Sequence, residues 1–337
     1  MRQGHIDNLI LNCSSLKLRF KVKMLELKAN CIIFLIISIS FEVSSSFKCE
    51  FKAINDLATP GYICYIKSIV GKEIHVPGKS DNDVRMVGIK KIQNLSKLTQ
   101  SEYPICQRFP NLKIVHIVSI ESIEDNMLNH CKNLTIADLS NNKIQQVPEN
   151  FYAENPKLDH LSLEGNKLTT LPENIFINQK ELRSLYLIKN QITFLPPNIF
   201  KSLISLKDLQ ISFNKIKILH PEWFVNLQNL RTFFATNNEI SDLPKDVFSS
   251  LESLEYLYLD SNQLTTIHSD SFGHIQKLSW ISFNDNKINA IDAKIIENTS
   301  ADRFEMNANV CAVEFINLKK NSNKLKKCFE NYQPREE

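Results

Sequence analysis

Seven side chains in the second half of the chain have the types and spacing of a recognition surface. They are Tyr186, Asp208, Phe234, Tyr256, Tyr258, Asp260 and Trp280. Exposed clusters of large apolar side chains mark interaction surfaces, and Tyr and Trp are favoured anchors of protein interfaces. We therefore expect these residues to bind a partner without covalent chemistry. The alternative interpretation is that the rings stack across neighbouring strands and only stabilise a sheet.

Catalytic chemistry has little support in the sequence. It contains no H-E-x-x-H and no G-x-S-x-G motif, and its 7 glycines include no phosphate-binding loop. Asp208 and His160 share one predicted column but lie two turns apart, roughly 10 Å, which is too far for an acid–base pair. The cysteines form no C-x-x-C pair and no His stands at ligand spacing, so we expect no metal site. We expect neither an enzyme nor a cofactor.

A strict repeat positions the seven candidate side chains. Seven asparagines stand 24 residues apart, at Asn142, Asn166, Asn190, Asn214, Asn238, Asn262 and Asn286. Each follows alternating apolar residues, as Leu161 and Leu163 precede Asn166, which is typical of a strand with one buried face. A fixed period of roughly 20–50 residues indicates a solenoid. We interpret the asparagines as scaffold, because a buried amide without backbone partners costs about 1–3 kcal/mol.

The rest of each turn has the same regularity. An aromatic column recurs every 24 residues at Tyr152, Phe176, Phe200, Phe224, Phe248 and Phe272. We expect these rings to form a spine in the core behind the strands. Because side chains alternate along a strand, counting back from each asparagine identifies the outward positions on the concave face. The seven candidate side chains occupy or adjoin those outward positions.

The chain divides into five predicted segments. Residues 1–46 hold an eleven-residue apolar run at 31–41 behind Lys21, Lys23 and Lys28, which predicts a secretory signal peptide. Met24 is an alternative start to Met1, and an uncleaved anchor is the alternative to cleavage. Residues 47–83 form an N-terminal cap, 84–133 irregular repeats, 134–298 regular repeats, and 299–337 a C-terminal cap and tail. Beyond Ile291 we expect the repeat frame to decay.

Cysteines, sequons and charge all fit an exported chain. Six cysteines lie outside the signal and the regular array: Cys49, Cys64, Cys106, Cys131, Cys311 and Cys328. Six cysteines allow fifteen pairings, of which proximity favours the three pairs of consecutive cysteines. The sequons at Asn94, Asn133 and Asn298 are candidate glycosylation sites. Removing the 6 basic and 3 acidic residues of positions 1–46 from totals of 40 and 37 leaves 34 of each, so the balance indicates no nucleic-acid partner.

The frame L-x-x-L-x-L-x-x-N-x-L-x-x-L resembles the leucine-rich repeat, and its 24-residue length resembles the extracellular type found in Toll-type receptor ectodomains. The short opening with Cys49 and Cys64 and the irregular early turns are similar to insect secreted leucine-rich-repeat immune proteins. The resemblance implies an α/β-type solenoid: a horseshoe with a concave parallel β-sheet of about nine turns and disulfide-bonded terminal caps. The chain differs from the immune group because it has no C-terminal coiled coil after Cys328.

The sequence and the resemblance together predict a function. We expect a secreted, extracellular, non-enzymatic glycoprotein without a membrane span in its mature chain. It would recognise a protein partner through its concave face, in innate immunity or cell-surface recognition. The alternative is a structural extracellular-matrix protein that self-associates.

Overall fold

The structure is a computed structural model of the 337-residue chain. It describes residues 105–335, apart from 124, 126, 300, 312–314 and 317, together with seven strands nearer the N-terminus. The predicted signal peptide falls outside the described residues except for short strands, and Asn94 falls outside them altogether. Those short strands form two antiparallel pairs, β1 (Asn12–Cys13) with β2 (Leu16–Lys17) and β3 (Lys21–Lys23) with β4 (Ile36–Ser38).

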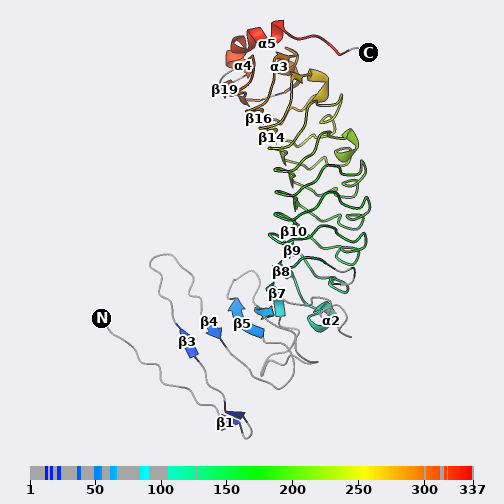
Figure 1. The fold of residues 1–337 in the computed structure, drawn as a ribbon, viewed down its shortest axis with the longest axis vertical. Coiled ribbons are helices and arrows are strands. Elements are labelled where there is room, and N and C mark those ends of the chain that lie inside the picture. The colour runs from blue at the N-terminus through cyan, green and yellow to red at the C-terminus, as the bar shows by residue number, and fades with distance from the viewer. Residues whose placement is uncertain are drawn as a thin grey trace, which may run out of the picture.

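One 13-stranded sheet runs the length of the solenoid and lines the inner side of its curve (Figure 1). Its strands are β5 (Cys49–Ile54), β6 (Gly61–Ile66), β7 (Val84–Lys90), β8 (Ile114–Val118), β9 (Ile136–Asp138), β10 (His160–Ser162), β11 (Ser184–Tyr186), β12 (Asp208–Gln210), β13 (Thr232–Phe234), β14 (Tyr256–Tyr258), β16 (Trp280–Ser282), β18 (Arg303–Glu305) and β19 (Phe315–Ile316). Strands β5 and β19 are antiparallel to their neighbours, and the strands from β6 to β18 pair in parallel. The predicted leucine-rich-repeat horseshoe is confirmed.

The outer side of the curve contains few helices. It consists mainly of turns, with the 3₁₀ segments η2 (Pro221–Trp223) and η3 (Ser269–Ser271) and a two-strand pairing of β15 (Thr266–Ile267) with β17 (Ala290–Ile291). Short helices stand near the ends: α2 (Ile105–Arg108), α3 (Ile295–Asn298), α4 (Leu318–Asn321), η4 (Ser322–Leu325) and α5 (Lys326–Glu330). Within the described residues, no helix is both long enough and apolar enough to cross a bilayer.

The asparagine ladder is confirmed as scaffold. Asn166 shows the pattern: its Oδ1 accepts a hydrogen bond from the Ile144 amide at 3.1 Å, and its Nδ2 donates to the carbonyls of Leu139 and Leu163 at 2.9 and 3.0 Å. All seven asparagines are buried and repeat this arrangement. Each amide therefore bonds backbone groups of its own turn and of the turn before it, as a buried amide requires.

The aromatic spine is also confirmed as core. Tyr152 and the five phenylalanines of that column are buried, and the rings of Phe176 and Phe200 stack at 6.4 Å between centroids. Tyr152 carries the one hydroxyl in this column, and that hydroxyl has no hydrogen-bond partner among the described residues. Burial raises the pKa of the Tyr152 phenol, because the charged form would lose its hydration.

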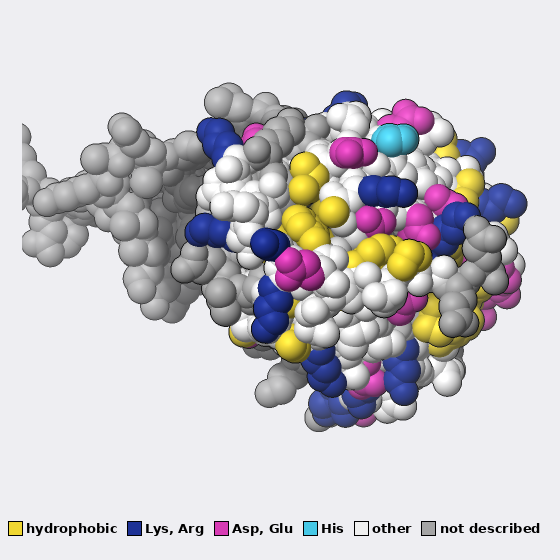
Figure 2. Space-filling view, turned by 90° about the horizontal axis from the view of Figure 1, so that it is seen from above, with side chains coloured by type: hydrophobic (Ala, Val, Ile, Leu, Met, Phe, Trp, Pro, Cys, Tyr) yellow, Lys and Arg dark blue, Asp and Glu magenta, His cyan; other side chains and the backbone are white. Residues whose placement is uncertain are grey.

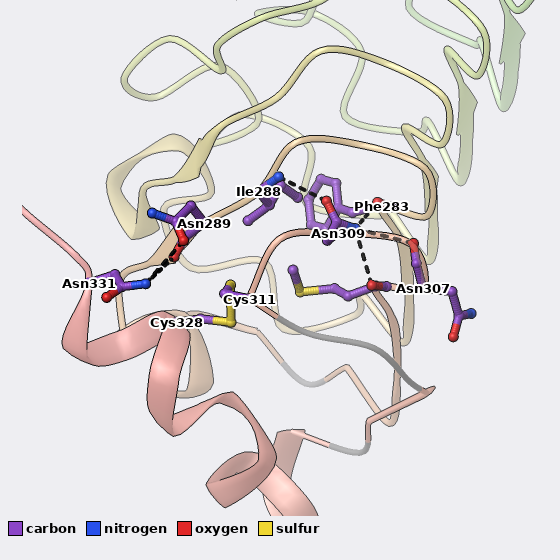
Figure 3. Close-up of a disulfide and its surroundings, with 9 residues drawn as sticks. Phe283, Ile288, Asn289, Asn307, Asn309, Cys311, Cys328 and Asn331 are labelled. Atoms are coloured by element: carbon purple, nitrogen blue, oxygen red, sulfur yellow. Dashed lines mark hydrogen bonds between the residues drawn. A yellow bond between two sulfur atoms is a disulfide. The ribbon is translucent and has the colours of Figure 1, made fainter.

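Disulfides stand on both sides of the regular turns. Cys106 bonds Cys131 before the regular turns, and Cys311 bonds Cys328 after them (Figure 3). Two of the three predicted pairs are thus confirmed. The register of β5 and β6 places Cys49 opposite Ile66 and Cys64 opposite Phe51. The pairing of Cys49 with Cys64 stays a prediction.

The repeat frame does not decay after Ile291, contrary to the expectation from the sequence. Strand β18 pairs in parallel with β16, and Asn309 continues the ladder. Its Oδ1 accepts from the Ile288 amide at 2.9 Å, and its Nδ2 donates to the Phe283 carbonyl at 2.8 Å (Figure 3). This last turn is 23 residues long, counted from Asn286 to Asn309, instead of 24.

Candidate recognition site on the concave face

Three-residue strands position the predicted side chains. In β12 and β13 the middle residue is buried in the core, while the first and third residues are half-buried and point to the concave side. The parallel register aligns equivalent residues of successive turns, so that Phe234 pairs with Tyr258 and Tyr256 with Trp280. Side chains that are 24 residues apart in the sequence are therefore neighbours on this face.

Four rings form a continuous cluster across β13, β14 and β16, and we call these residues the aromatic cluster: Phe234, Tyr256, Tyr258 and Trp280. Phe234 and Tyr258 stack at 4.4 Å with planes 5° apart. Tyr258 and Tyr256 contact Trp280 at 5.6 and 6.5 Å between centroids. Tyr256 is exposed and the other three rings are half-buried, so the cluster stabilises the sheet and still presents area to a partner.

A cation from the last turn completes the cluster. The guanidinium carbon of Arg303 lies 3.8 Å from the centroid of the Trp280 ring. Its Nε is 2.6 Å from Oε1 of Glu305, so the cation is held by both a carboxylate and a ring face. Figure 2, which views the molecule from the C-terminal end, shows hydrophobic side chains lying among acidic and basic ones.

The sequence analysis missed Arg303 and Glu305, although a signal existed. Ala301, Phe304, Met306 and Asn309 fit the frame L-x-x-L-x-L-x-x-N when Ala, Phe and Met are admitted at the apolar positions. The residues six and four positions before Asn309 then fall in the same two outward columns as Trp280 and Ser282. That turn does not match the 24-residue pattern in the sequence, because it is one residue shorter and has no leucine at these three apolar positions.

Carboxylates and amides border the aromatic cluster. Oδ1 of Asp260 accepts hydrogen bonds from the Ser282 hydroxyl and from the Asn284 amide, the latter at 3.0 Å. Oε2 of Glu305 accepts from the Asn284 side chain at 3.0 Å. Burial, and then the nearby charge of Glu305, raises the pKa of the Tyr258 phenol. The ring cluster therefore faces a locally acidic environment.

Two predicted residues lie apart from the aromatic cluster. Tyr186 contacts His160 edge-on at 4.9 Å. Asp208 stands in β12, between the strands that carry Tyr186 and Phe234, and makes no ion pair among the described residues. The structure thus brings together five of the seven predicted residues and leaves Tyr186 and Asp208 on the neighbouring strands.

A separate polar pair occupies the N-terminal part of the concave face. Nδ1 of His116 is 2.7 Å from Oδ2 of Asp138. Burial alone would raise the pKa of Asp138, but hydrogen bonds from Ser140 and His116 outweigh it and lower that pKa. In the part of the chain that the structure describes, no three His, Cys, Asp or Glu side chains are placed to hold a metal ion.

Two candidate glycosylation sites are engaged in hydrogen bonds. Nδ2 of Asn133 donates to the Pro110 carbonyl at 3.2 Å, and its Oδ1 accepts from Lys157 at 3.0 Å. Nδ2 of Asn298 donates to the Ser269 carbonyl at 3.1 Å. Each Nδ2 carries two hydrogens and uses one of them in these bonds, so the second is the one that a glycan would replace. Glycosylation at these positions stays a prediction.

Family models match most of the repeat region. The model "Leucine rich repeat" matches residues 180–240 and 229–288, and "BspA type Leucine rich repeat region (6 copies)" matches residues 85–207. No curated protein matches the chain.

Solved structures share the fold. A structure of a TLR13–ssRNA13 complex aligns with a TM-score of 0.53 and 25% identity, over 62% of this chain and 30% of that one. The ectodomain of the plant membrane receptor kinase GASSHO1/SCHENGEN3 from Arabidopsis thaliana, in complex with CASPARIAN STRIP INTEGRITY FACTOR 2, aligns with a TM-score of 0.51 and 21% identity. That alignment covers 67% of this chain and 27% of the receptor chain. The chain therefore spans less than a third of the length of either protein.

Proposed function

Because residues 85–288 are leucine-rich repeats, we propose that this chain is an extracellular binding protein that recognises a protein partner through its concave face. The aromatic cluster is the observation that carries the proposal. Four neighbouring rings on consecutive strands supply a large contact area at low conformational-entropy cost, and three of them are Tyr or Trp, which are enriched among the hot spots of protein interfaces.

The cysteine chemistry supports an extracellular setting for this binding. Disulfides such as Cys106–Cys131 and Cys311–Cys328 form and persist in oxidising compartments. Both solved structures with this fold are complexes, one of TLR13 with ssRNA13 and one of a plant membrane receptor kinase ectodomain with CASPARIAN STRIP INTEGRITY FACTOR 2. The resemblance to leucine-rich-repeat immune proteins extends the proposal to recognition in innate defence.

The test is capture of secreted or cell-surface proteins by the purified chain, followed by mass spectrometry. The double variant Phe234→Ala, Tyr258→Ala removes the stacked pair at the centre of the aromatic cluster. The matched control is Ile177→Ala, Val225→Ala, which removes two exposed apolar side chains outside the strands. Both variants are expected to keep the wild-type circular dichroism, and only the first is expected to lose the partner. Equal capture by both variants would refute the proposal.

Self-association is the second candidate function, and one observation favours it. Phe194 and Ile218 occupy equivalent positions of consecutive turns and are 50% and 58% exposed, away from the concave strands. An apolar pair of this kind favours a contact between two copies. Sedimentation of the wild type and of Phe194→Asp, Ile218→Asp tests it: a concentration-independent monomer for both rules out self-association.

A further inference from the structure

The aromatic cluster and its border have the chemistry of a cation-binding site. We propose that the cluster receives a Lys or Arg side chain of a basic peptide segment, and that Arg303 occupies one ring of this site in the unbound protein. The inference rests on the proposed function, because it names the chemistry of the partner that the concave face recognises. It also makes Arg303 an internal competitor of that partner.

The contact between Arg303 and Trp280 shows that this surface accommodates a cation. The guanidinium lies 3.8 Å from the ring centroid, within the distance at which a ring face attracts a positive charge. Glu305 compensates the charge at 2.6 Å. Tyr256 and Tyr258 contact the same indole from β14, whereas Arg303 reaches it from β18, so further ring area adjoins Trp280 on the side away from Arg303. A second cation would find the same combination of rings and carboxylates.

The charge of the whole concave face favours a basic partner. In the turns of Asn142 to Asn309, the positions six, four and two residues before each ladder asparagine carry five carboxylates, and Arg303 is the one Lys or Arg among them. The five are Asp138, Glu164, Asp208, Asp260 and Glu305. Lys189 pairs with Glu164 at 3.0 Å, whereas Asp208 and Asp260 have no cation partner among the described residues.

This acidity separates the chain from an RNA-binding surface. Nucleic-acid affinity comes mainly from Lys and Arg side chains that neutralise phosphates, and a face with excess carboxylates repels a phosphate backbone. The solved TLR13 relative is in complex with single-stranded RNA. We therefore do not expect this concave face to bind RNA, although the two proteins share a fold.

Two polar groups at the cluster have no hydrogen-bond partner among the described residues. Asp260 uses Oδ1 for both of its hydrogen bonds, so Oδ2 has no protein partner within the described residues. The indole Nε1 of Trp280 is buried and likewise has no acceptor there. A Lys or Arg side chain placed over Tyr258 would meet the carboxylate oxygen of Asp260.

The contact of Arg303 with Trp280 predicts in which direction an Arg303 substitution changes the affinity for a cationic peptide. If it competes with the incoming cation, Arg303→Gln is expected to tighten binding of an oligolysine peptide by about two- to fivefold, the worth of one exposed cation–ring contact. Asp260→Asn is expected to weaken the same binding by a similar or larger factor. Glu252→Gln, an exposed carboxylate outside the strands in the neighbouring turn, is the matched control and is expected to bind as wild type.

Intrinsic fluorescence measures the binding directly, because the chain has 2 tryptophans. Trp223 is buried and donates to the Pro196 carbonyl, so Trp280 is the reporter that a ligand on the concave face can reach. Titration with oligolysine is expected to change the emission, and rising salt is expected to weaken the effect. Oligoglutamate and a single-stranded RNA oligonucleotide are expected to leave it unchanged.

The outcomes separate this inference from the proposed function. Failure of oligolysine to bind, weaker oligolysine binding by Arg303→Gln, or binding of the RNA would overturn the inference. If the captured protein partner still depends on Phe234 and Tyr258 in that case, the proposed function stands. If the partner is retained by the Phe234→Ala, Tyr258→Ala variant while oligolysine binds with the expected signs, the concave face takes cations but the captured partner binds elsewhere.

Discussion

Asn214→Ala tests the ladder at the centre of the solenoid. The Asn214 Oδ1 accepts from the Ile192 amide at 3.0 Å, and its Nδ2 donates to the carbonyls of Leu187, Ile211 and Ser212. Each of these carbonyls also accepts from another donor, so the alanine leaves them bonded. The Ile192 amide has no second acceptor among the described residues. One buried donor is therefore orphaned.

The unpaired amide of Ile192 determines how much stability Asn214→Ala is expected to lose. An unsatisfied buried amide costs about 1–3 kcal/mol, and the cavity left by the side chain brings the expected loss to roughly 2–4 kcal/mol. Urea unfolding followed by circular dichroism measures it, with the slope examined together with the midpoint because solenoids depart from two-state behaviour. Asn178→Ala is the control: its exposed side chain makes one hydrogen bond, to the Ala153 carbonyl, and its loss should stay within about 0.5 kcal/mol.

Asn214→Asp sharpens the same test through pH. The aspartate keeps an acceptor for the Ile192 amide but turns an anion toward three carbonyls, so its pKa should be raised in the folded protein. The penalty is then absent below the unfolded pKa of about 3.9 and grows as pH rises through the interval up to the folded pKa. An alanine variant as stable as Asn178→Ala, or an aspartate variant whose loss does not depend on pH, would refute the role of the ladder.

Three further outcomes are expected. Tyr152→Phe should raise the free energy of unfolding by about 1 kcal/mol in urea titrations, because it removes a buried hydroxyl that has no partner among the described residues; a loss of stability would contradict this. Cys311→Ser, Cys328→Ser should cost about 2–4 kcal/mol relative to the oxidised wild type in urea titrations, since the bond closes a separation of 17 residues; equal stability of the two proteins would contradict this. Burial, aided by Arg335, lowers the pKa of His268, so stability should fall as pH drops below about 6.5, and His268→Gln should flatten that part of the acid profile.

The regular part of the fold was predictable because its determinants are local and periodic. Each ladder asparagine, such as Asn166, stands at a fixed distance from the apolar residues that form its strand, so burial and facing follow by counting. The contacts between side chains on the concave face are harder to predict from the sequence. Tyr186 has the same outward orientation as Phe234, but two strand spacings, about 10 Å, separate them, and Tyr186 contacts His160 instead.

Contacts that join remote segments left no signal in the sequence. Arg335 donates to the Leu243 carbonyl across 92 residues and lies 3.6 Å from Asp242. Tyr332 bonds His268 across 64 residues. A side chain that reaches a backbone carbonyl in another turn follows no periodicity, because the acceptor is present in every residue. The contact of Arg303 with Trp280 differs, since it lies in the repeat frame and only the shortened turn concealed it.

The ladder gives the solenoid a direction. Each asparagine reaches back: Asn142 bonds the Ile120 amide of the turn before it, and Asn309 bonds that of Ile288. One backbone amide of each turn therefore lacks its acceptor until the asparagine of the next turn is present. During synthesis from the N-terminus, each turn would wait about one repeat length for its last acceptor. Loss of residues from the C-terminal side would expose an unbonded amide at every step, whereas loss from the N-terminal side would free an asparagine side chain to bond water.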